Sequence, residues 1–349
     1  MHILINDFIG GALDRGIPLY VRNLIEGLRG EGLRVSVVRA PPFCRKLPRS
    51  MLYMIAVLVE QTLLPLIGAV LRADLTIYPY NSVAVIDLLT RRGRIVVHDL
   101  EQLNRPQSFS KLYYLFCYRA VKWLNAPIFT ISEITRQRLT QSGLFGSGPV
   151  TLLPNTFYAF ERLAAVETPQ RSASILLCTG STANKDIETV VAEYLPNVLA
   201  QGHRVSILGL HKASDMANLQ PVAAFMASGQ LHVCGRLSDE EVARAYRLHT
   251  VVWVHSLREG FGRCVVEGRL AGARVLATDI AEFAELRDGD VYLYNNPARF
   301  FAELDRLVHM TGAAAPYTGY PYRELLRRAI EGAMRAKPAQ GAAQSPQAI

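Results

Sequence analysis

The stretch that decides the fold of this chain is His255-Ser-Leu-Arg-Glu-Gly-Phe-Gly-Arg-Cys-Val-Val-Glu-Gly268. It follows the apolar run Val251–Val254 and leads into a segment with a helical pattern. The sequence therefore predicts a strand, a loop broken by glycines and then a helix. Gly260 and Gly262 have no Cβ, so backbone N–H groups at the start of the helix can approach a ligand closely. Such N–H groups, together with the positive end of the helix dipole, suit a phosphate.

Two glutamates lie on either side of these glycines. Glu259 lies in the loop, and we expect Glu267, eight positions later, about two turns inside the helix. One carboxylate beside the phosphates and a second further along suit a ligand with hydroxyl groups on both sides of a diphosphate. That is the chemistry of a nucleotide sugar. The alternative is a helix N-terminus with a solvated acidic residue and no ligand.

Strand-like and helix-like runs alternate along the whole chain. The expected strands of the first half are His2–Asn6, Arg34–Arg39, Leu75–Tyr78, Arg94–His98, Ile128–Ile131 and Val150–Leu153. Those of the second half are Ser174–Cys178, Val205–Leu208, Leu231–Cys234, Val251–Val254 and Arg274–Ala277. Strands that alternate with helices are typical of parallel sheets covered on both faces. The predicted fold class is α/β, with two Rossmann-like, doubly wound domains that face a cleft.

The domain boundary is expected in the polar stretch at residues 161–173, which has little hydrophobic pattern. We expect an N-terminal domain at 1–160, a C-terminal domain at 170–320 and a C-terminal helix at 321–336. The tail at 337–349 is rich in Ala, Gln and Pro and is expected to be disordered. In the second half, Ser238 and Glu241 predict a capping box at the start of a helix.

The net charge of +8 lies entirely in the first half of the chain. Residues 1–160 carry 18 Lys and Arg against 10 Asp and Glu, whereas residues 161–349 carry 20 of each. A basic face can serve nucleic acid, an anionic membrane or a phosphorylated acceptor. We discount nucleic acid because no helix-turn-helix, zinc-finger or RNA-binding signature accompanies the charge. A solvated basic surface without a partner is the alternative.

The segment Met51–Leu71 is apolar apart from four side chains, those of Tyr53, Glu60, Gln61 and Thr62. Its length would allow a transmembrane helix. The glutamate and glutamine near its middle argue against a span. We expect a helix packed on the first domain, with an apolar face that touches the bilayer beside the basic cluster Arg45, Lys46 and Arg49.

The five cysteines are widely spaced and include no Cys-x-x-Cys pair. They are expected to be buried thiols in a reducing cytoplasm. The chain begins with a strand-like run and lacks the pattern of a secretion signal. The chain is expected to lack an Asp-x-Asp metal motif, and we therefore expect no bound Mg²⁺ or Mn²⁺.

The Glu-x7-Glu spacing with Glu-Gly-Phe-Gly intact, late in a chain of alternating strands and helices, resembles glycosyltransferase family 4. The resemblance covers roughly residues 1–335. It implies a GT-B fold of two Rossmann-like domains, a C-terminal helix that crosses back to the N-terminal domain, and a retaining glycosyl transfer. Cys178-Thr-Gly-Ser-Thr-Ala-Asn-Lys185 and Cys234-Gly235-Arg236 match two further turns of the family.

The resemblance also implies roles for individual residues. His98 would contact the donor sugar, Lys185 would neutralise the diphosphate, and Glu259 would hold the sugar hydroxyls. The other implied donor-binding residues are Gly10, Gly11, Gly235, Arg236, Gly260, Phe261, Gly262, Arg263 and Glu267, the last holding the ribose hydroxyls. The implied acceptor residues are Glu101, Asn104 and Arg105. The sequence departs from the family pattern at Ser181 and Asn184, where basic residues are usual.

The expected activity is metal-independent transfer of a hexose to a glycan or lipid-linked saccharide in bacterial surface polysaccharide synthesis, with no cofactor. Mannose from GDP-mannose is the expectation weighted by the family, with UDP- and dTDP-sugars as alternatives. The expected location is the cytoplasm, at the inner face of the cytoplasmic membrane. Two other functions stay open: a non-catalytic relative that binds sugar nucleotides or a partner, and a nicotinamide-dependent oxidoreductase. The missing Gly-x-Gly-x-x-Gly fingerprint disfavours the oxidoreductase.

Overall fold

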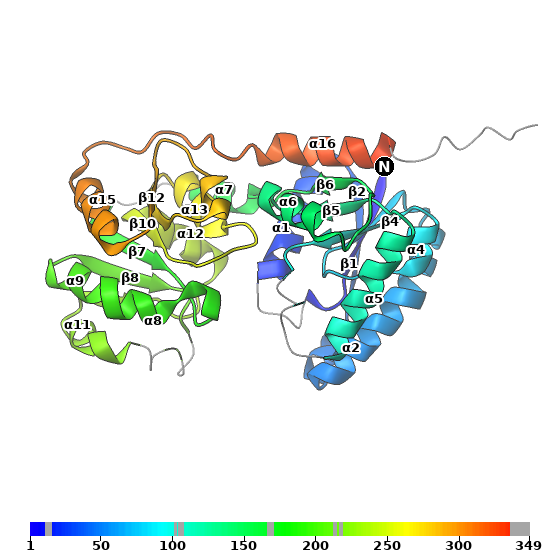
Figure 1. Ribbon diagram of the computed structural model, residues 1–349, viewed down its shortest axis with the longest axis horizontal. Helices are drawn as coiled ribbons and strands as arrows, with labels where there is room; N and C mark the ends of the chain where they lie inside the picture. Colours follow the sequence, from blue (N-terminus) through cyan, green and yellow to red (C-terminus); the bar gives the residue numbers. More distant parts are fainter. Residues whose placement is uncertain are drawn as a thin grey trace, which may run out of the picture. The chain divides into compact units, whose positions relative to one another are not determined.

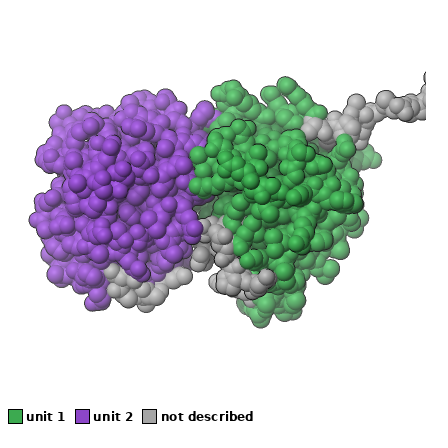
Figure 2. Space-filling view, in the orientation of Figure 1, with its two compact units in different colours: residues 1–156, 322–349 green, residues 157–321 purple. Residues whose placement is uncertain are grey.

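The computed structural model describes residues 1–10, 16–100, 103, 108–165, 171–211, 215 and 219–335. Contacts divide the chain into two compact units, which Figure 2 shows in different colours. Unit 1 consists of Met1–Thr156 and Tyr322–Ile349, and unit 2 of Phe157–Pro321. The expected linker at 161–173 thus begins inside unit 2, because the helix α7 (Tyr158–Ala164) packs on α12 (Asp239–Leu248) of that unit. The expected disordered tail lies outside the described residues.

Unit 1 is built on a parallel sheet with the order β2-β1-β3-β4-β5-β6. Its strands are β1 (His2–Asp7), β2 (Arg34–Arg39), β3 (Leu75–Tyr78), β4 (Gly93–Val97), β5 (Ile128–Thr130) and β6 (Val150–Leu152). Every residue of β1, β3 and β4 is buried, as expected for strands with helices on both faces. The chain leaves β1 for β2 on one side and returns to β3 on the other, so the strand order reverses at β1.

The helices of unit 1 include one from the far end of the chain. They are α1 (Gly16–Gly30), α2 (Arg49–Leu58), α3 (Leu64–Val70), α4 (Val85–Leu89), α5 (Phe109–Trp123), α6 (Glu133–Ser142) and α16 (Tyr322–Arg335). The last of these, α16, packs on β6 and α1 (Figure 1), and Arg327 donates to Glu31 at 2.7 Å. Ser132 caps α6 by accepting from the backbone N–H of Thr135.

The apolar segment of the sequence is helical throughout. A π-helical turn, η3 (Val59–Leu63), joins α2 to α3, and together they form the one candidate membrane span among the described residues, Ser50–Val70. Only 22% of its most apolar window is buried. The Glu60 side chain nevertheless points into unit 1 and is 5% exposed. Because the Glu60 carboxylate is buried inside unit 1, the segment is consistent with a helix that packs on the sheet and not with one that crosses a bilayer.

Unit 2 repeats this architecture with the strand order β12-β11-β10-β7-β8-β9. Its parallel strands are β7 (Ser172–Cys178), β8 (Arg204–Leu208), β9 (Leu231–Val233), β10 (His249–Val254), β11 (Arg274–Thr278) and β12 (Val291–Tyr294). The strand β12 is absent from the sequence-based expectation, although its four residues form an apolar run like those of the predicted strands. The α/β class with two doubly wound sheets is confirmed.

The main helices of unit 2 are α7, α8 (Ile187–Thr189), α9 (Leu195–Ala200), α11 (Ala223–Ala227), α12, α13 (Arg263–Leu270), α14 (Ala281–Ala284) and α15 (Pro297–His309). Most of them are short, and the longer ones are α12, α13 and α15. A second π-helical turn, η6 (Val190–Tyr194), joins α8 to α9. The predicted capping box is confirmed, because Ser238 and Glu241 exchange hydrogen bonds at the start of α12.

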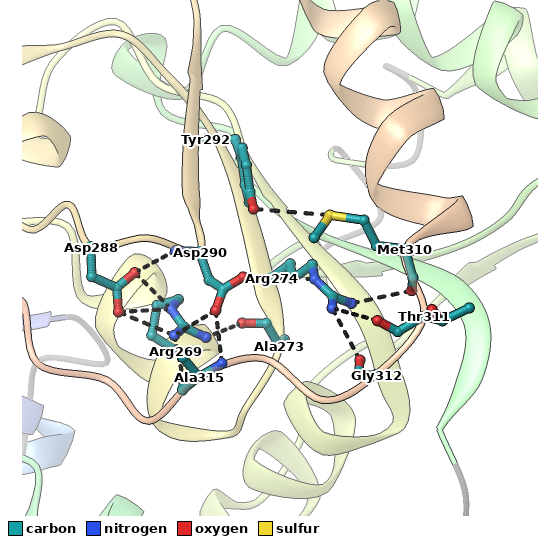
Figure 3. A network of polar contacts seen from close by, with 10 residues as sticks. All are labelled: Arg269, Ala273, Arg274, Asp288, Asp290, Tyr292, Met310, Thr311, Gly312 and Ala315. Carbon is teal, nitrogen blue, oxygen red and sulfur yellow. Dashed lines mark hydrogen bonds and ion pairs between the residues drawn. The ribbon is translucent and has the colours of Figure 1, made fainter.

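A buried arginine network fixes the amino ends of β11 and β12 (Figure 3). Arg269 is 1% exposed and donates to Asp288 at 3.0 Å and to Asp290 at 3.4 Å. It also donates to the carbonyl of Ala315 at 2.6 Å, which ties the segment after α15 to the sheet. Arg274 adds a further cation, with its Nε 3.7 Å from Asp290.

Asp288 and Asp290 form an Asp-x-Asp sequence, so the expectation that the chain lacks this pattern is wrong. Both carboxylates are paired with arginine and lie at the amino edge of the sheet. Among the described residues, no group of three or more His, Cys, Asp or Glu side chains is arranged to hold a metal ion.

Replacing Arg269 by Ala should lower the free energy of unfolding of unit 2 by about 3–5 kcal/mol, because it leaves two buried carboxylates without their main counter-ion. Exposed Arg306 of the same unit, which pairs with Glu303 on α15, provides the control, and Arg306→Ala should cost less than about 1 kcal/mol. Denaturant unfolding is followed by the fluorescence of Trp253 after Trp123→Phe leaves it as the sole tryptophan. Equal effects of the two arginine substitutions would contradict a stabilising role for the network.

Candidate functional site

Two loops of unit 2 lie side by side where its strand order reverses. The chain runs from β7 to β8 and β9 on one side and then returns to β10 on the other side of β7. Because β7 and β10 are parallel neighbours, the loops that follow them leave the same edge of the sheet. Ligands of open α/β sheets bind outside the carboxyl ends of the strands at such a reversal.

Hydrogen bonds join the two loops directly. The carbonyl of Asn184, in the loop after β7, accepts from the backbone N–H of Leu257 and from the hydroxyl of Ser256, both at 2.8 Å. The amide of Asn184 donates to the carbonyl of Arg258 at 3.2 Å. Next to it, Asp186 lies 3.8 Å from Nε2 of His255. The first loop is therefore fixed against the stretch of sequence that predicts the fold.

Lys185 and Glu259, both predicted site residues, form an ion pair between these loops. Their side chains are 19% and 17% exposed, so the pair is largely shielded from water. Burial lowers the pKa of Lys185, but the Glu259 carboxylate, together with Cys264 and Cys178, more than offsets this, and the net pKa is raised above its ordinary value. In the free protein each of these charges is thus neutralised by the other.

Arg263 and Glu267 form a second ion pair one helical turn apart. Arg263 donates to Glu267 at 2.9 Å, and its guanidinium lies 4.6 Å from the centre of the Phe157 ring. The helix α13 begins at Arg263, so Glu267 lies one turn inside it and not the expected two. A ligand hydroxyl that binds Glu267 would share this carboxylate with Arg263.

Gly262 has a structural reason to be glycine. It precedes α13 with a φ of 101°, which is strained for other residues. A Cβ at this position would also lie 2.8 Å from two ring carbons of Phe283. The buried Phe261 packs on Tyr320, with ring centres 4.7 Å apart. Together with the backbone conformation, these contacts fix the start of the helix whose N–H groups are predicted to meet a phosphate.

The predicted residues Gly235 and Arg236 follow β9, at the edge of the unit 2 sheet. Gly235 has a φ of 68°, and a Cβ there would meet nothing within 4 Å. Arg236 is exposed. The glycine is therefore explained by its backbone conformation and not by a close neighbour in the free protein.

In unit 1, His98 directly follows β4 and is 6% exposed. Its Nε2 donates to the carbonyl of Pro79 at 2.9 Å, and its ring meets the Tyr20 ring edge-on. Burial lowers the pKa of His98 to about 4, although the bond to the carbonyl acts in the opposite direction. The imidazole is therefore neutral at pH 7, with Nδ1 as its remaining acceptor. Its contact with a donor sugar stays a prediction.

Gly10 follows β1 and is packed against a polar link at the strand reversal of unit 1. Asp7 accepts from the hydroxyl of Tyr80 at 2.8 Å and from Arg39 at 2.9 Å. A Cβ on Gly10 would lie 1.9 Å from Oδ1 of Asp7, so a larger residue here would displace the Asp7 carboxylate from this link. The other predicted residues of unit 1, Gly11, Glu101, Asn104 and Arg105, lie outside the described residues.

Two contacts of the site were not predicted from the sequence: the link that Asn184 makes between the loops, and the pairing of Asp186 with His255. The side-chain amide of an asparagine in a loop can bond backbone groups of a neighbouring loop, so the residue type of Asn184 was the available signal.

The Lys185–Glu259 pair predicts a change in titration. In Glu259→Gln, burial acts without its main opposing charge, so the pKa of Lys185 should fall and its neutral amine should become more abundant near pH 8. Lys185 should then be acylated faster by acetic anhydride, as followed by peptide mass spectrometry between pH 7 and 10. Exposed Lys122 in unit 1 is the internal control. Unchanged reactivity of Lys185 would show that Glu259 does not set its proton affinity.

Comparisons with known proteins agree with this geometry. The family model "Glycosyl transferases group 1" matches residues 173–310, which lie within unit 2. No curated protein sequence matches the chain. A sucrose-phosphate synthase from Thermosynechococcus elongatus has 17% identity and a TM-score of 0.63, with 96% of each chain covered.

Two further solved structures show the range of proteins with this fold. HepE from Anabaena, in complex with UDP and glucose, has 15% identity and a TM-score of 0.61 over 96% of this chain and 97% of its own. A UDP-GlcNAc 2-epimerase from Methanocaldococcus jannaschii has 10% identity and a TM-score of 0.57 over 95% and 99%. The likenesses establish a GT-B fold, and with the family model they support membership of the GT-B glycosyltransferase superfamily.

Proposed function

We propose that this chain is a retaining, metal-independent glycosyltransferase of family 4. It would move a hexose from a nucleoside-diphosphate sugar to a hydroxyl group of a glycan or lipid-linked saccharide. The observation that carries the proposal is the Lys185–Glu259 pair at the strand reversal of unit 2. It combines a cation for phosphate with a carboxylate for hydroxyls, inside the region matched by the glycosyltransferase model.

The proposed reaction breaks the bond between the sugar C1 and the diphosphate and forms a bond from C1 to the acceptor oxygen. The acceptor proton passes to the departing phosphate. Negative charge grows on the diphosphate as it leaves, so Lys185 and the start of α13 would contribute most in the transition state. Glu259 would orient the sugar through its hydroxyls, and Glu267 would bind the ribose.

The donor is proposed as a hexose on a nucleoside diphosphate. The family resemblance favours GDP-mannose. One solved structure of HepE holds UDP and glucose, and another holds UDP-glucose. Both of these ligands share the diphosphate and the hexose hydroxyls for which the paired loops are suited, so UDP-sugars are the first alternative.

We also propose that unit 1 binds the inner face of the cytoplasmic membrane through α2, α3 and α5. The outer face of the α2–α3 segment carries an exposed apolar row at helical spacing, formed by Met51, Met54, Leu58, Leu63, Leu66 and Val70. The helix α5 carries a similar row, formed by Phe109, Leu112, Phe116 and Trp123. Tyr113 of α5 bonds Glu60 and Gln61, so the two helical segments pack together.

The charges of these helices support an anionic membrane as the partner. Glu60 is the only acidic residue in α2, η3, α3 and α5, and it is buried. Exposed Lys46, Arg119 and Lys122 lie on or beside the same helices. A surface of apolar and basic side chains without exposed acidic ones suits the headgroup region of an anionic bilayer. A lipid-linked acceptor would be found at that surface.

Lys185→Ala should lower kcat by roughly 30- to 1,000-fold, equivalent to about 2–4 kcal/mol of transition-state stabilisation. Glu259→Gln should also lower kcat but leave the affinity for free nucleoside diphosphate nearly unchanged, since it is assigned to the sugar. Exposed Arg306→Ala in the same unit is the control.

Rates are measured with excess EDTA, in which wild-type activity should persist. Wild-type turnover in Lys185→Ala, or loss of activity that Mg²⁺ restores, would contradict the proposal.

The protein should pellet with anionic liposomes at low salt and be largely released by about 0.5 M NaCl. Gln substitutions at Arg45, Lys46 and Arg49 should weaken binding by roughly 100-fold, because each basic side chain contributes about 1 kcal/mol. The control removes the same charge from Arg29, Arg34 and Arg335, elsewhere on unit 1. Equal binding to neutral liposomes would exclude the charge effect, and release by detergent alone would indicate an inserted helix.

A further inference from the structure

A small pocket lies inside unit 1, with a mostly apolar lining and a few polar side chains. It is lined by side chains from the carboxyl ends of β1 and β3 and from the helical segments α2–η3 and α5. The lining residues that matter for its chemistry are Asn6, Tyr53, Glu60, Tyr80, Ser82 and Tyr113. Because β1 is where the strand order of this sheet reverses, the pocket lies where α/β sheets bind ligands.

The π-helical turn η3 explains why a carboxylate reaches this pocket. Within it, two consecutive residues, Glu60 and Gln61, both turn toward the protein interior. Gln61 bonds the backbone of Val83 and of Val85, which anchors the turn to the chain after β3. π-helical turns inside α-helices are uncommon and occur frequently at functional sites.

The Glu60 carboxylate is fixed but retains capacity for another hydrogen bond. Asn6 and Ser82 donate to Oε2 at 2.7 and 2.9 Å, and Tyr113 donates to Oε1 at 2.6 Å. A carboxylate offers about four acceptor positions, so about one is left for a ligand. Burial raises the pKa of Glu60 to about 7, although these three hydrogen bonds act to lower it. Near neutral pH it can therefore either accept from or donate to a hydroxyl group.

The size of the pocket limits what can enter. It offers about 30 Å³, and a cavity needs roughly 10–15 Å³ by a comparable measure to hold one water. A whole sugar ring does not fit, but one hydroxyl or hydroxymethyl arm does. Aromatic side chains with a few fixed polar groups are the usual lining of a small-molecule site.

We propose that this pocket receives a hydroxyl-bearing arm of a saccharide, the sugar end of the acceptor, with Glu60 as its hydrogen-bonding partner. The identification of that saccharide as the acceptor rests on the proposed function. The α2–η3 and α5 segments that line the pocket also carry the exposed apolar rows. A sugar attached to a lipid at that surface would therefore be near the pocket.

The test fills the pocket without touching its carboxylate. Ala56 lines the pocket, and Ala56→Leu should occlude it. Ala69→Leu makes the same change at an exposed position of α3. Binding of methyl glycosides of glucose, galactose, mannose and rhamnose to the full chain is measured by saturation-transfer NMR. At least one glycoside should bind to the wild type and to Ala69→Leu, and its affinity should fall at least tenfold in Ala56→Leu.

A second variant tests the role of the carboxylate. Glu60→Gln should weaken binding of the same glycoside, provided that its circular dichroism spectrum and thermal midpoint show a folded chain. Tyr113→Phe, which removes one donor to Glu60, keeps the test decisive if Glu60→Gln does not fold. Absence of binding by all four glycosides, or equal binding by Ala56→Leu, would overturn the proposal. Nucleoside diphosphate binding measured on the same samples reports separately on the proposed function.

Discussion

The ion pair between Lys185 and Glu259 is the interaction on which the candidate site depends. Breaking a buried pair leaves an uncompensated charge, which typically costs about 3–5 kcal/mol when burial is complete, so each residue constrains the other. Any anion that approaches Lys185 competes with Glu259 for the same ammonium group. On the proposed function, a diphosphate replaces Glu259 as the counter-ion and frees its carboxylate for hydroxyl groups. Phosphate binding and sugar orientation are then coupled through one pair of side chains.

Both units carry a polar link at the point where their strand order reverses. In unit 2 the link is the Lys185–Glu259 pair, and in unit 1 it is the contact of Asp7 with Tyr80 and Arg39. The shared topology explains this, because parallel neighbours deliver two loops to one edge of the sheet. In unit 1, Glu60 on the π-helical turn lines the same pocket as Tyr80 of the link. On the functions proposed above, the repeated architecture provides two separate places for hydroxyl-bearing ligands.

Much of the fold could be predicted from the sequence because its central strands are continuous apolar runs with strong helical patterns between them. Val251–Val254 and the capping box of Ser238 are examples in which local chemistry decides the structure. The strand β12 was missed although Val291–Tyr294 is as short and as apolar as Val251–Val254, so the local signal for it was present. The start of α13 depends on the backbone of Gly262 packing on Phe283, a contact that no local pattern reveals.

The residues of the candidate site could be predicted from the sequence, but the ion pairs between them could not. Lys185 and Glu259 could be named from the family resemblance, yet their ion pair depends on β7 and β10 being neighbours. The same is true of Glu60, whose inward direction requires the π-helical turn η3. Asp288 and Asp290 show the opposite case. Their Asp-x-Asp sequence suggests a metal site, but their carboxylates are paired with Arg269 and Arg274. Sequence spacing reports which side chains are present, whereas tertiary pairing decides their charge partners.

The central claim is that the paired loops of unit 2 bind a nucleoside diphosphate through Lys185. A thermal-shift panel of GDP, UDP and dTDP, each against its own nucleoside, tests this most directly. A ligand at a hundred times its dissociation constant adds about 2.7 kcal/mol of stability. The account predicts that at least one diphosphate stabilises the wild type, that its nucleoside does not, and that Lys185→Ala removes the difference. Stabilisation by none of the three, or an equal shift in Lys185→Ala, would contradict it.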